Sequence, residues 1–356
     1  AGQYIGALGH NGNISPEFDK LSKDGVLFTR MFSGGTRTNR GLSNTLLSFP
    51  SLPRYKSIIN DSAVDQDFGT LGTILKQRAY HTNFIFSGDP NFDNMKGFFR
   101  SHGFDRFYGN EIFSDETFST SWGVSDEALF NKSLEILKKE PAPFLSVILT
   151  ISNHPPYLYP KESRFISVDA DATTESRLNA FKYSDWALGE FMSKAKKLPL
   201  YNRTIFVILG DHGFISNEFD QNKSIELASY HIPCLIIAPD LQPQINNRVA
   251  SQTDIIPTIL DLLGGTFIHH SWGKNLFKSK PRNDFAIMIP AGMNHIIGMI
   301  QDETLLIYNF LSKSEFFHVK DFSNNIKIEE IITIQPYHKE MEKKMLGYLK
   351  MASHTL

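Results

Sequence analysis

Short apolar runs alternate with amphipathic segments over the first three quarters of the chain. The apolar runs have the length of buried strands, and the apolar residues between them recur at helical spacing. Strands are predicted at residues 26–32, 82–86, 144–151, 204–209 and in the run that ends at Ala238. Helices are predicted directly after Ser15 and at residues 41–49, 68–79, 126–139, 174–197 and 254–263. This alternation predicts an α/β fold with a mostly parallel central sheet and helices on both of its faces.

The pattern changes after about Phe285. Four short strand-like runs, at residues 285–289, 295–300, 304–308 and 316–319, precede a terminal amphipathic helix at 336–352. Consecutive short strands favour an antiparallel sheet. We therefore expect two parts, an α/β domain at residues 1–284 and a small C-terminal α+β subdomain at residues 285–356.

Composition narrows the function classes. The 356 residues are 41% hydrophobic, which suits a large buried core. The formal net charge of −2 and the absence of a long basic run argue against nucleic acid as a partner. Cys234 is the single cysteine and lies in an apolar run, which predicts a buried, unreactive thiol. No apolar run approaches the roughly 18 residues of a membrane span.

A stretch rich in glycine, threonine and arginine follows the strand predicted at 26–32. It reads Ser-Gly-Gly-Thr-Arg-Thr-Asn-Arg-Gly over residues 33–41 and sets Thr38 between Arg37 and Arg40. Glycines let the backbone turn tightly, and the helix predicted at 41–49 would aim its N-terminal amides at the turn. Thr38 is therefore a candidate nucleophile facing a phosphate. Similar clusters also form ordinary solvated turns.

Polar residues lie at the ends of three further predicted strands, after two of them and at the start of the third. Asp211 and His212 follow the strand at 204–209, His154 follows the strand at 144–151, and His231 begins the run to Ala238. A carboxylate, an imidazole and the Thr38 oxygen could converge on one cation and activate that hydroxyl. His154 and His231 could bind a phosphoryl oxygen or protonate a leaving alkoxide. The alternatives are a helix cap at Asp211 and structural hydrogen bonds from the three histidines.

Six motifs in a fixed order carry a family resemblance. They are Ser15-Pro-Glu-Phe-Asp-Lys-Leu21, Gly35-Thr-Arg-Thr-Asn-Arg-Gly41, Ser152-Asn-His-Pro-Pro-Tyr157, Gly210-Asp-His-Gly213, Tyr230-His-Ile-Pro233 and Ser251-Gln-Thr-Asp-Ile-Ile-Pro-Thr258. Together they resemble the lipoteichoic acid synthase and phosphoglycerol transferase branch of the sulfatase-like, alkaline-phosphatase-type superfamily. The resemblance extends over about residues 1–276.

The resemblance implies a metal-dependent phosphotransferase that acts outside the cytoplasm, in the periplasm or on the outer face of the membrane. Thr38 matches the nucleophile and a metal ligand, and Asp211 and His212 match two further ligands of a divalent metal, usually Mn²⁺, with Mg²⁺ or Zn²⁺ as alternatives. The donor would be phosphatidylglycerol, and the acceptor a glycan or a glycerol-phosphate chain. The implied substrate-binding residues are Arg37, Arg40, Asn153, His154 and His231, of which the two histidines also match catalytic positions.

Two departures from the family pattern matter. The family carries a metal-binding glutamate at the end of its first core strand, just before the part that matches residues 2–6, and the sequence begins after that position. Glu17 does not replace it. We therefore expect weak metal binding by this form of the chain, and expect the chain to be the soluble part of a membrane-anchored protein. The second departure is at residues 91–95, Asn-Phe-Asp-Asn-Met, where lipoteichoic acid synthases place a Trp and an Arg.

Three other functions compete with phosphoglycerol transfer. A sulfatase would need a Cys or Ser in a Cys-x-Pro-x-Arg type motif, which the residues after Cys234 do not provide. A phosphoethanolamine transferase or a phosphodiesterase could use the same nucleophile, because donor preference lies in the loops of the pocket. A catalytically dead module that binds anionic lipid head groups or glycans would need no complete metal site.

Overall fold

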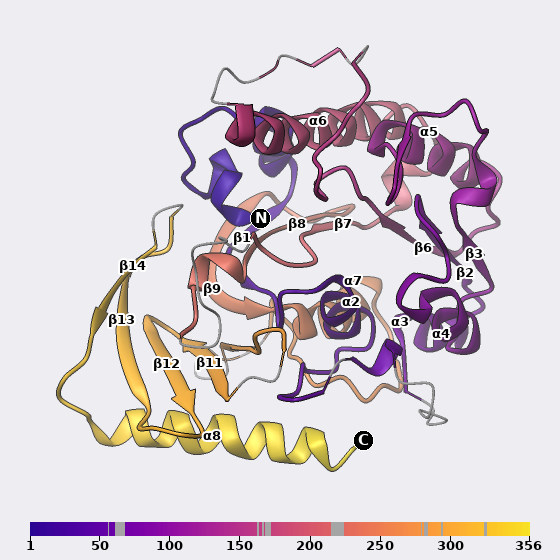
Figure 1. Ribbon diagram of the computed structural model, residues 1–356. Coiled ribbons are helices and arrows are strands. Elements are labelled where there is room, and N and C mark those ends of the chain that lie inside the picture. Colours follow the sequence, from indigo (N-terminus) through magenta and orange to yellow (C-terminus); the bar gives the residue numbers. More distant parts are fainter. Residues whose placement is uncertain are drawn as a thin grey trace.

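The computed structural model describes residues 1–55, 57–60, 68–161, 164–165, 167, 172–214, 224–278, 280, 284–292, 295–323 and 326–356, without the side chains of 172–175. It consists of an α/β part with a smaller antiparallel sheet and a long terminal helix beside it (Figure 1). The fold class predicted from the sequence is thus confirmed. Across the described ranges, no helix combines the length and apolarity that crossing a membrane requires.

The strands of the α/β part form two main sheets. The first has the order β7 (Phe206–Leu209), β8 (His231–Ile237), β1 (Val26–Phe32) and β9 (Gln244–Ser251). In it β1 runs parallel to β9, and β8 runs antiparallel to both β1 and β7. The second sheet has the order β3 (Arg106–Tyr108), β2 (His81–Phe86) and β6 (Phe144–Leu149), and all its pairs are parallel. A small hairpin joins β4 (Ser119–Thr120) to β5 (Gly123–Val124).

Two apolar strands lie at sheet edges. Within the described residues β6 pairs only with β2, and β7 pairs only with β8. Every residue of both strands is nevertheless only half-buried, although the sequences Phe-Leu-Ser-Val-Ile-Leu and Phe-Val-Ile-Leu suit a strand buried on both faces. Unpaired backbone and exposed apolar side chains at an edge favour the addition of another strand. In the described part of the chain, β6 and β7 therefore each leave one side of the strand without a backbone partner.

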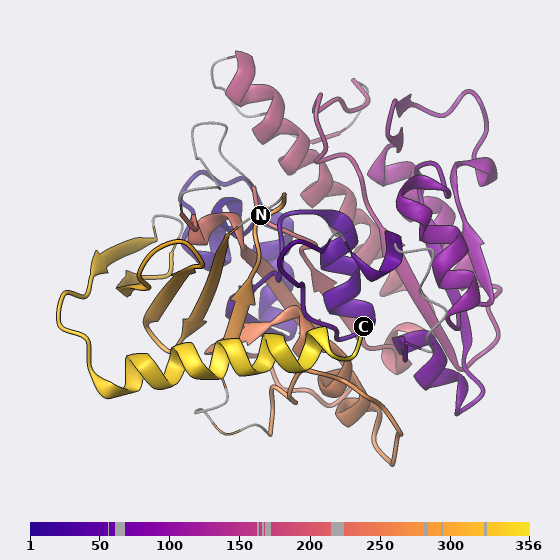
Figure 2. The same ribbon diagram turned by 60° about the horizontal axis from the view of Figure 1, so that its bottom comes forward.

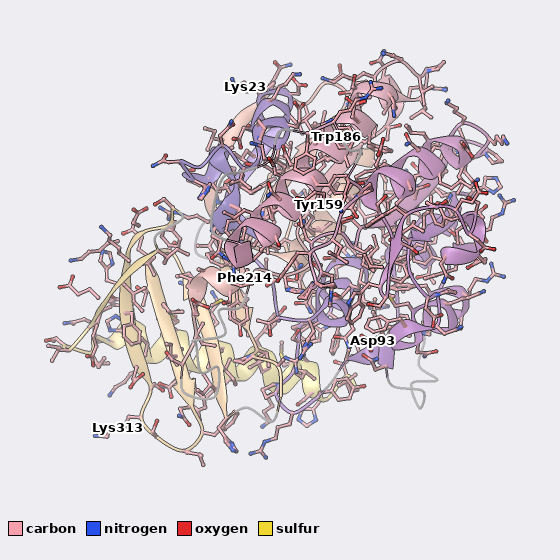
Figure 3. All side chains as sticks on the ribbon, turned by 45° about the horizontal axis from the view of Figure 1, so that its top comes forward. Lys23, Asp93, Tyr159, Trp186, Phe214 and Lys313 are labelled. Carbon is pink, nitrogen blue, oxygen red and sulfur yellow. The ribbon has the colours of Figure 1, made fainter. Side chains whose placement is uncertain are left out.

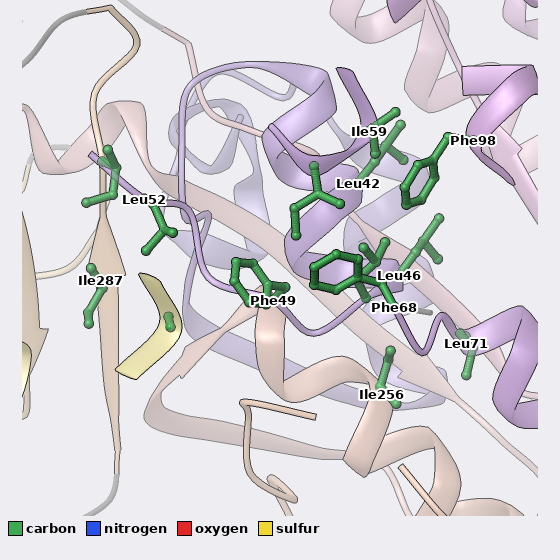
Figure 4. Packing of buried hydrophobic residues seen from close by; sticks show 14 of the residues in the cluster. Leu42, Leu46, Phe49, Leu52, Ile59, Phe68, Leu71, Phe98, Ile256 and Ile287 are labelled. Carbon is green, nitrogen blue, oxygen red and sulfur yellow. The ribbon is translucent and has the colours of Figure 1, made fainter. Parts of the chain in front are cut away.

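Helices cover the sheets on two sides and form separate apolar clusters. On one side α1 (Pro16–Leu21), α5 (Asp126–Leu137) and α6 (Ala172–Ala195) pack together. On the other side a larger cluster joins α2 (Thr38–Leu46), α3 (Leu71–Lys76), α4 (Met95–Ser101) and α7 (Ile255–Leu263). Figure 4 shows Leu42 and Leu46 of α2 packed among Phe49, Phe68 and Ile256. The nucleophile candidate therefore lies on a helix that is anchored in the core.

Helix α1 is held by a contact with α6 rather than by a side-chain cap. Ser15 occupies the N-cap position but its side chain makes no capping bond, and its hydroxyl instead bonds the Asp19 carboxylate. The amides of Glu17 and Phe18 donate to the two carboxylate oxygens of Asp185 on α6. Burial is the main cause that raises the pKa of Asp185, to about 7, against the opposing effect of these two hydrogen bonds. A long-range contact thus fixes α1 on α6.

The C-terminal subdomain is a five-stranded antiparallel sheet backed by one helix. Its order is β10 (Phe285–Met288), β11 (Ile296–Gln301), β12 (Thr304–Asn309), β13 (Glu315–Asp321) and β14 (Lys327–Glu330). The helix α8 (Pro336–Ser353) buries Met341, Met345 and Leu349, and Figure 2 shows it running along the sheet towards α2. Short 3₁₀ turns occur at Gly2–Tyr4, Gly6–Leu8, Ser22–Asp24, Ile58–Asn60, Phe92–Asn94, Asn110–Ile112, Tyr201–Arg203, Leu227–Ser229 and Gln252–Asp254.

Candidate active site

The turn between β1 and α2 is packed too closely for any residue but glycine at two positions. A Cβ on Gly34 would lie 1.5 Å from the Asn44 side-chain oxygen, and one on Gly35 would lie 2.6 Å from the Arg40 side chain. Neither glycine has a positive φ. The glycines therefore provide space rather than the unusual backbone angles that a tight turn suggests from sequence. The parallel bridge from Gly35 to Ile289 also ties this turn to the strand β10 region.

Thr38 is the first residue of α2, three residues earlier than the sequence predicted for the helix. Its side chain is half-buried, and its hydroxyl makes no hydrogen bond within the described part of the chain, whereas Thr36 is buried. The N-terminus of a helix carries partial positive charge from its unpaired amides. Arg37, the N-cap residue, is exposed beside it. The hydroxyl of Thr38 is thus available to a ligand in a positive environment.

Arg40 faces away from such a ligand. Its side chain is 5% exposed, and the guanidinium donates to the carbonyl oxygens of Ile289 and Pro290, each at 2.8 Å, and of Tyr55, also at 2.8 Å. These bonds link the first turn of α2 to the segment after β10. Of the two arginines expected to contact phosphate, Arg40 is therefore committed to backbone carbonyls and Arg37 is not.

Asp211 and His212 follow β7 in a tight turn. The Nδ1–H of His212 donates to the carbonyl of Gly213 at 2.8 Å, since a carbonyl can only accept, and this leaves Nε2 with its lone pair free. Nε2 lies 3.5 Å from Oδ2 of Asp211. Both atoms can lie at about 2.1 Å from a single ion, because that separation is smaller than twice a typical bond to a divalent metal. The pair therefore fits part of a metal site.

Two contacts hold the Asp211 turn against the Thr38 turn. Gly41, on the same face of α2 as Thr38, packs so closely that a Cβ on it would lie 2.3 Å from the Asp211 carbonyl oxygen. The buried amide of Gln252 accepts from the Gly34 N–H at 3.2 Å and donates to the carbonyls of Gly210 at 3.0 Å and Asp211 at 2.7 Å. The structure thus brings together the two turns that the sequence suggested as the halves of one site.

His154 and Asn153 are exposed in the turn after β6. The His154 ring lies against Trp122, with centroids 3.7 Å apart, and Trp122 in turn contacts the edge of Phe92. The Nδ1–H of His154 donates to the Pro155 carbonyl at 3.1 Å, which leaves Nε2 free. These three rings form an aromatic surface, here called the aromatic wall (Phe92, Trp122 and His154). Sequence analysis did not select Trp122, because its partner lies 32 positions away in the chain.

Hydrogen bonds connect the aromatic wall to α2. Asn39, next to Thr38, donates from its amide to the side-chain oxygen of Asn60. Asn60 donates to the carboxylate of Asp93 at 3.0 Å, and Asp93 is adjacent to Phe92. Asp93, labelled in Figure 3, is thus linked through Asn60 and Asn39 to the start of α2. The wall therefore lies beside the Thr38 turn rather than across the molecule from it.

His231 has a different environment. It is 1% exposed, its Nε2–H donates to the Thr29 carbonyl at 2.7 Å, and its Nδ1 lies against the backbone of Gly2. Burial is the main cause that lowers the pKa of His231, to about 4, so the ring is neutral at physiological pH. The structure does not bring His231 to a surface that a substrate could reach, and it joins β8 to β1 instead.

A cavity of about 420 Å³ lies elsewhere, between the α/β part and α8. Its lining includes Trp272, Lys274, Phe285, Lys344 and Tyr348. None of its lining residues is Thr38, Asp211, His212 or His154, so the volume of this cavity says nothing about the candidate active site.

Comparisons with known proteins identify the family to which the chain belongs. The sulfatase family model matches residues 1–265. Lipoteichoic acid synthase from Staphylococcus aureus is 27% identical over 369 aligned residues, which cover 96% of this chain and 53% of that protein. The chain therefore spans about half the length of the curated relatives it matches.

Solved structures extend the comparison. A protein of the alkaline phosphatase superfamily from Vibrio parahaemolyticus is 32% identical with a TM-score of 0.87, and the match covers 99% of this chain and 84% of that one. The lipoteichoic acid synthase LtaP from Listeria monocytogenes shares the fold, with a TM-score of 0.77 at 20% identity over 96% of this chain and 86% of that one. The chain belongs to the sulfatase family of enzymes, within the alkaline phosphatase superfamily.

Proposed function

We propose that the chain is the catalytic part of an extracytoplasmic phosphotransferase that moves glycerol phosphate from phosphatidylglycerol to a glycan or glycerol-phosphate acceptor. The observation that carries this proposal is the unpaired hydroxyl of Thr38 at the N-terminus of α2, held against the Asp211–His212 turn by Gly41 and Gln252. The similarity to lipoteichoic acid synthase supports the choice of donor. The membrane surface that presents the lipid would be the second partner.

Thr38 acts as the nucleophile in this proposal. Its oxygen attacks the phosphorus of the donor, the bond to the diacylglycerol oxygen breaks, and glycerol phosphate remains esterified to Thr38 while diacylglycerol leaves with a proton. The acceptor hydroxyl then attacks the same phosphorus, and the Thr38 oxygen regains its proton. Arg37 and the α2 amides stabilise the charge on the phosphoryl oxygens. Arg40 holds the turn in place through its three carbonyl partners.

His154 would move the proton. Its exposed Nε2 can take a proton from the attacking hydroxyl and give it to the leaving oxygen, while the bond from Nδ1–H to Pro155 fixes the ring. Asn153, exposed beside it, is the proposed substrate contact on this turn. We leave His231 out of the substrate contacts and assign it the structural role described above.

Asp211, His212 and the Thr38 oxygen would hold the divalent metal, with Mn²⁺ as the first choice and Mg²⁺ or Zn²⁺ as alternatives. When bound, the ion would lower the pKa of the Thr38 hydroxyl and offset phosphoryl charge. Across the described ranges no three His, Cys, Asp or Glu residues gather as a metal cluster. We expect weak binding by this form of the chain, measured by calorimetric titration with Mn²⁺. Tight, stoichiometric binding would contradict that expectation.

Release of diacylglycerol from labelled phosphatidylglycerol, with Mn²⁺ present, tests the proposed function. Thr38→Ala should abolish release, because no other hydroxyl occupies the first position of α2. Thr45→Ala, a half-buried threonine later on the same helix, is the matched control and should keep wild-type release. Equal release by Thr38→Ala and the wild-type chain would overturn the assignment of the nucleophile, and an inactive wild-type chain that still binds glycerol phosphate would favour a binding module.

A further inference from the structure

Arg177 on α6 carries a charge that no described residue neutralises. Its guanidinium carbon lies 4.4 Å from the centre of the Phe214 ring and 5.7 Å from that of Tyr4. Its Nε is buried and has no hydrogen-bond partner. Neither a hydrogen bond nor an ion pair involves this guanidinium in the part of the chain that the structure describes. Aromatic faces are therefore its main contacts.

One of those contacts, Phe214, follows a turn of the candidate active site. Phe214 is two residues beyond His212, and Figure 3 places it beside the beginning of α6. Tyr157 is three residues beyond His154, in the motif that also contains Asn153. Tyr159, two residues further along, stacks on Tyr183 of α6 with ring centroids 5.9 Å apart, which holds this segment against the helix that carries Arg177. Burial raises the pKa of Tyr157, and the positive charge of Arg177 partly offsets the rise. Arg177 thus lies where the His154 turn and the Asp211 turn approach α6.

Tyr157 supplies a second donor at the same place. Its hydroxyl makes no hydrogen bond within the described residues. Its backbone adopts φ 62°, a left-handed conformation that is costly for an aromatic residue, and its amide donates to the His154 carbonyl at 2.9 Å. Strain of this kind gathers at functional sites, where the surrounding structure holds it in place. The turn thus fixes Tyr157 relative to His154.

A partly desolvated guanidinium with unused donors is costly to maintain. Contact with aromatic faces recovers only part of that cost. Guanidinium groups match phosphate oxygens in a two-pronged arrangement, and such charge-assisted hydrogen bonds are about twice as strong as neutral ones. An anion with two or three oxygens would use the donors of Arg177 and the hydroxyl of Tyr157 together.

We propose that Arg177 and Tyr157 form an anion-binding subsite that takes a phosphate ester group of the substrate. The subsite rests on the proposed function for its role in turnover, because it places a phosphate ester beside His154 and the Asp211 turn. The ester could belong to the lipid donor or to an anionic acceptor. The pair replaces no metal ligand and takes no part in bond making.

Calorimetric titration of the whole chain with sn-glycerol 1-phosphate, and separately with inorganic phosphate, tests the subsite without turnover. Arg177→Met keeps the apolar packing on Phe214 and Tyr4 and removes the charge, and it should raise the dissociation constant about tenfold or more. Tyr157→Phe should raise it several-fold. Arg203→Met, an exposed arginine in the turn before β7, is the matched control and should leave it unchanged.

Arg177→Lys separates binding from packing. Lysine keeps the charge but not the planar fork, so an affinity between those of the wild-type chain and Arg177→Met supports the subsite, provided that the thermal unfolding midpoints agree. Arg177→Met with an affinity within twofold of the wild type would overturn it. If Arg177→Met does not fold, the same criterion applies to Arg177→Lys.

Turnover then identifies the source of the phosphate ester. A higher KM for phosphatidylglycerol vesicles in Arg177→Lys assigns the subsite to the donor, and a higher KM for the acceptor assigns it to the acceptor. An unchanged KM for both would overturn the role in turnover. Should the wild-type chain show no transfer while Arg177→Met still weakens glycerol phosphate binding, the proposed function fails and the subsite stands.

Discussion

Gln252 is the residue whose removal should most clearly separate the two halves of the site. Its amide oxygen accepts from Gly34 in the Thr38 turn, and its amide nitrogen donates to Gly210 and Asp211 in the turn proposed to bind metal. The side chain is 0% exposed, so water does not replace these bonds in the folded chain. We therefore regard Gln252 as a positioning residue that fixes Asp211 relative to Thr38.

The magnitude follows from the three bonds. Each contributes about 0.5–1.5 kcal/mol net, so Gln252→Ala should lower the free energy of unfolding by about 1.5–4.5 kcal/mol. The rate of diacylglycerol release should fall even at low temperature, where the variant stays folded. A displacement of about 1 Å between reacting groups can cost about a hundredfold in rate. The loss should appear in kcat rather than KM, since the substitution leaves Arg37, the proposed phosphate contact, in place.

Chemical denaturation and steady-state release of diacylglycerol measure the two effects. Gln252→Glu has the same shape but turns an oxygen towards the two carbonyls, so it should be at least as damaging as Gln252→Ala. Gln77→Ala is the matched control, because Gln77 also bridges two segments, through Ile268, but on the surface. A kcat within threefold of wild type for both Gln252 variants would refute the reasoning.

Three further predictions concern other contacts. Gly41→Ala should unfold the site or abolish release of diacylglycerol, because the new Cβ would lie 2.3 Å from the Asp211 carbonyl oxygen. Gly347→Ala meets no atom within 4 Å and should stabilise the chain by about 0.5–1 kcal/mol. Both are checked by denaturant unfolding. Asp185 has a folded pKa of about 7, above the ordinary aspartate value of 3.8, so the stability it contributes is present below about pH 4 and is lost as the pH rises through 7. The free energy of unfolding, measured between pH 4 and 8, should decline less in Asp185→Asn than in the wild-type chain. An equal decline in both chains would contradict this. Trp122→Ala should raise KM several-fold with little change in kcat, whereas Phe310→Ala, exposed on the C-terminal subdomain, should change neither.

The strands that the sequence predicted are those whose burial leaves a strong pattern. β1, β2, β6 and β8 are short runs rich in apolar residues, and their predicted bounds agree with the structure to within two residues at either end. β9 was missed because its first half, Gln-Ile-Asn-Asn, is exposed and polar, and it is a strand only through its pairing with β1. The sequence also gave no reason to expect that β8 runs antiparallel to its neighbours, because chain direction in a sheet depends on the connecting loops.

Some residues of the candidate site could be predicted from the sequence, and the roles of others could not. Thr38, Asp211 and His212 were predicted because each follows a strand and carries a recognisable chemical group, and the structure places their turns together through Gly41 and Gln252. Arg40 could not be distinguished from Arg37 by type. Only the positions of the Ile289 and Tyr55 carbonyls show that one guanidinium is occupied and the other exposed.

Residues that surround the reacting groups leave no such pattern, because each acts through a neighbour that is distant in sequence. Trp122 contacts His154 across 32 positions, and Arg177 reaches Phe214 across 37. The candidate reacting groups thus lie in short turns with a sequence pattern, whereas the side chains proposed to contact the substrate come from separate elements, which only the folded chain reveals.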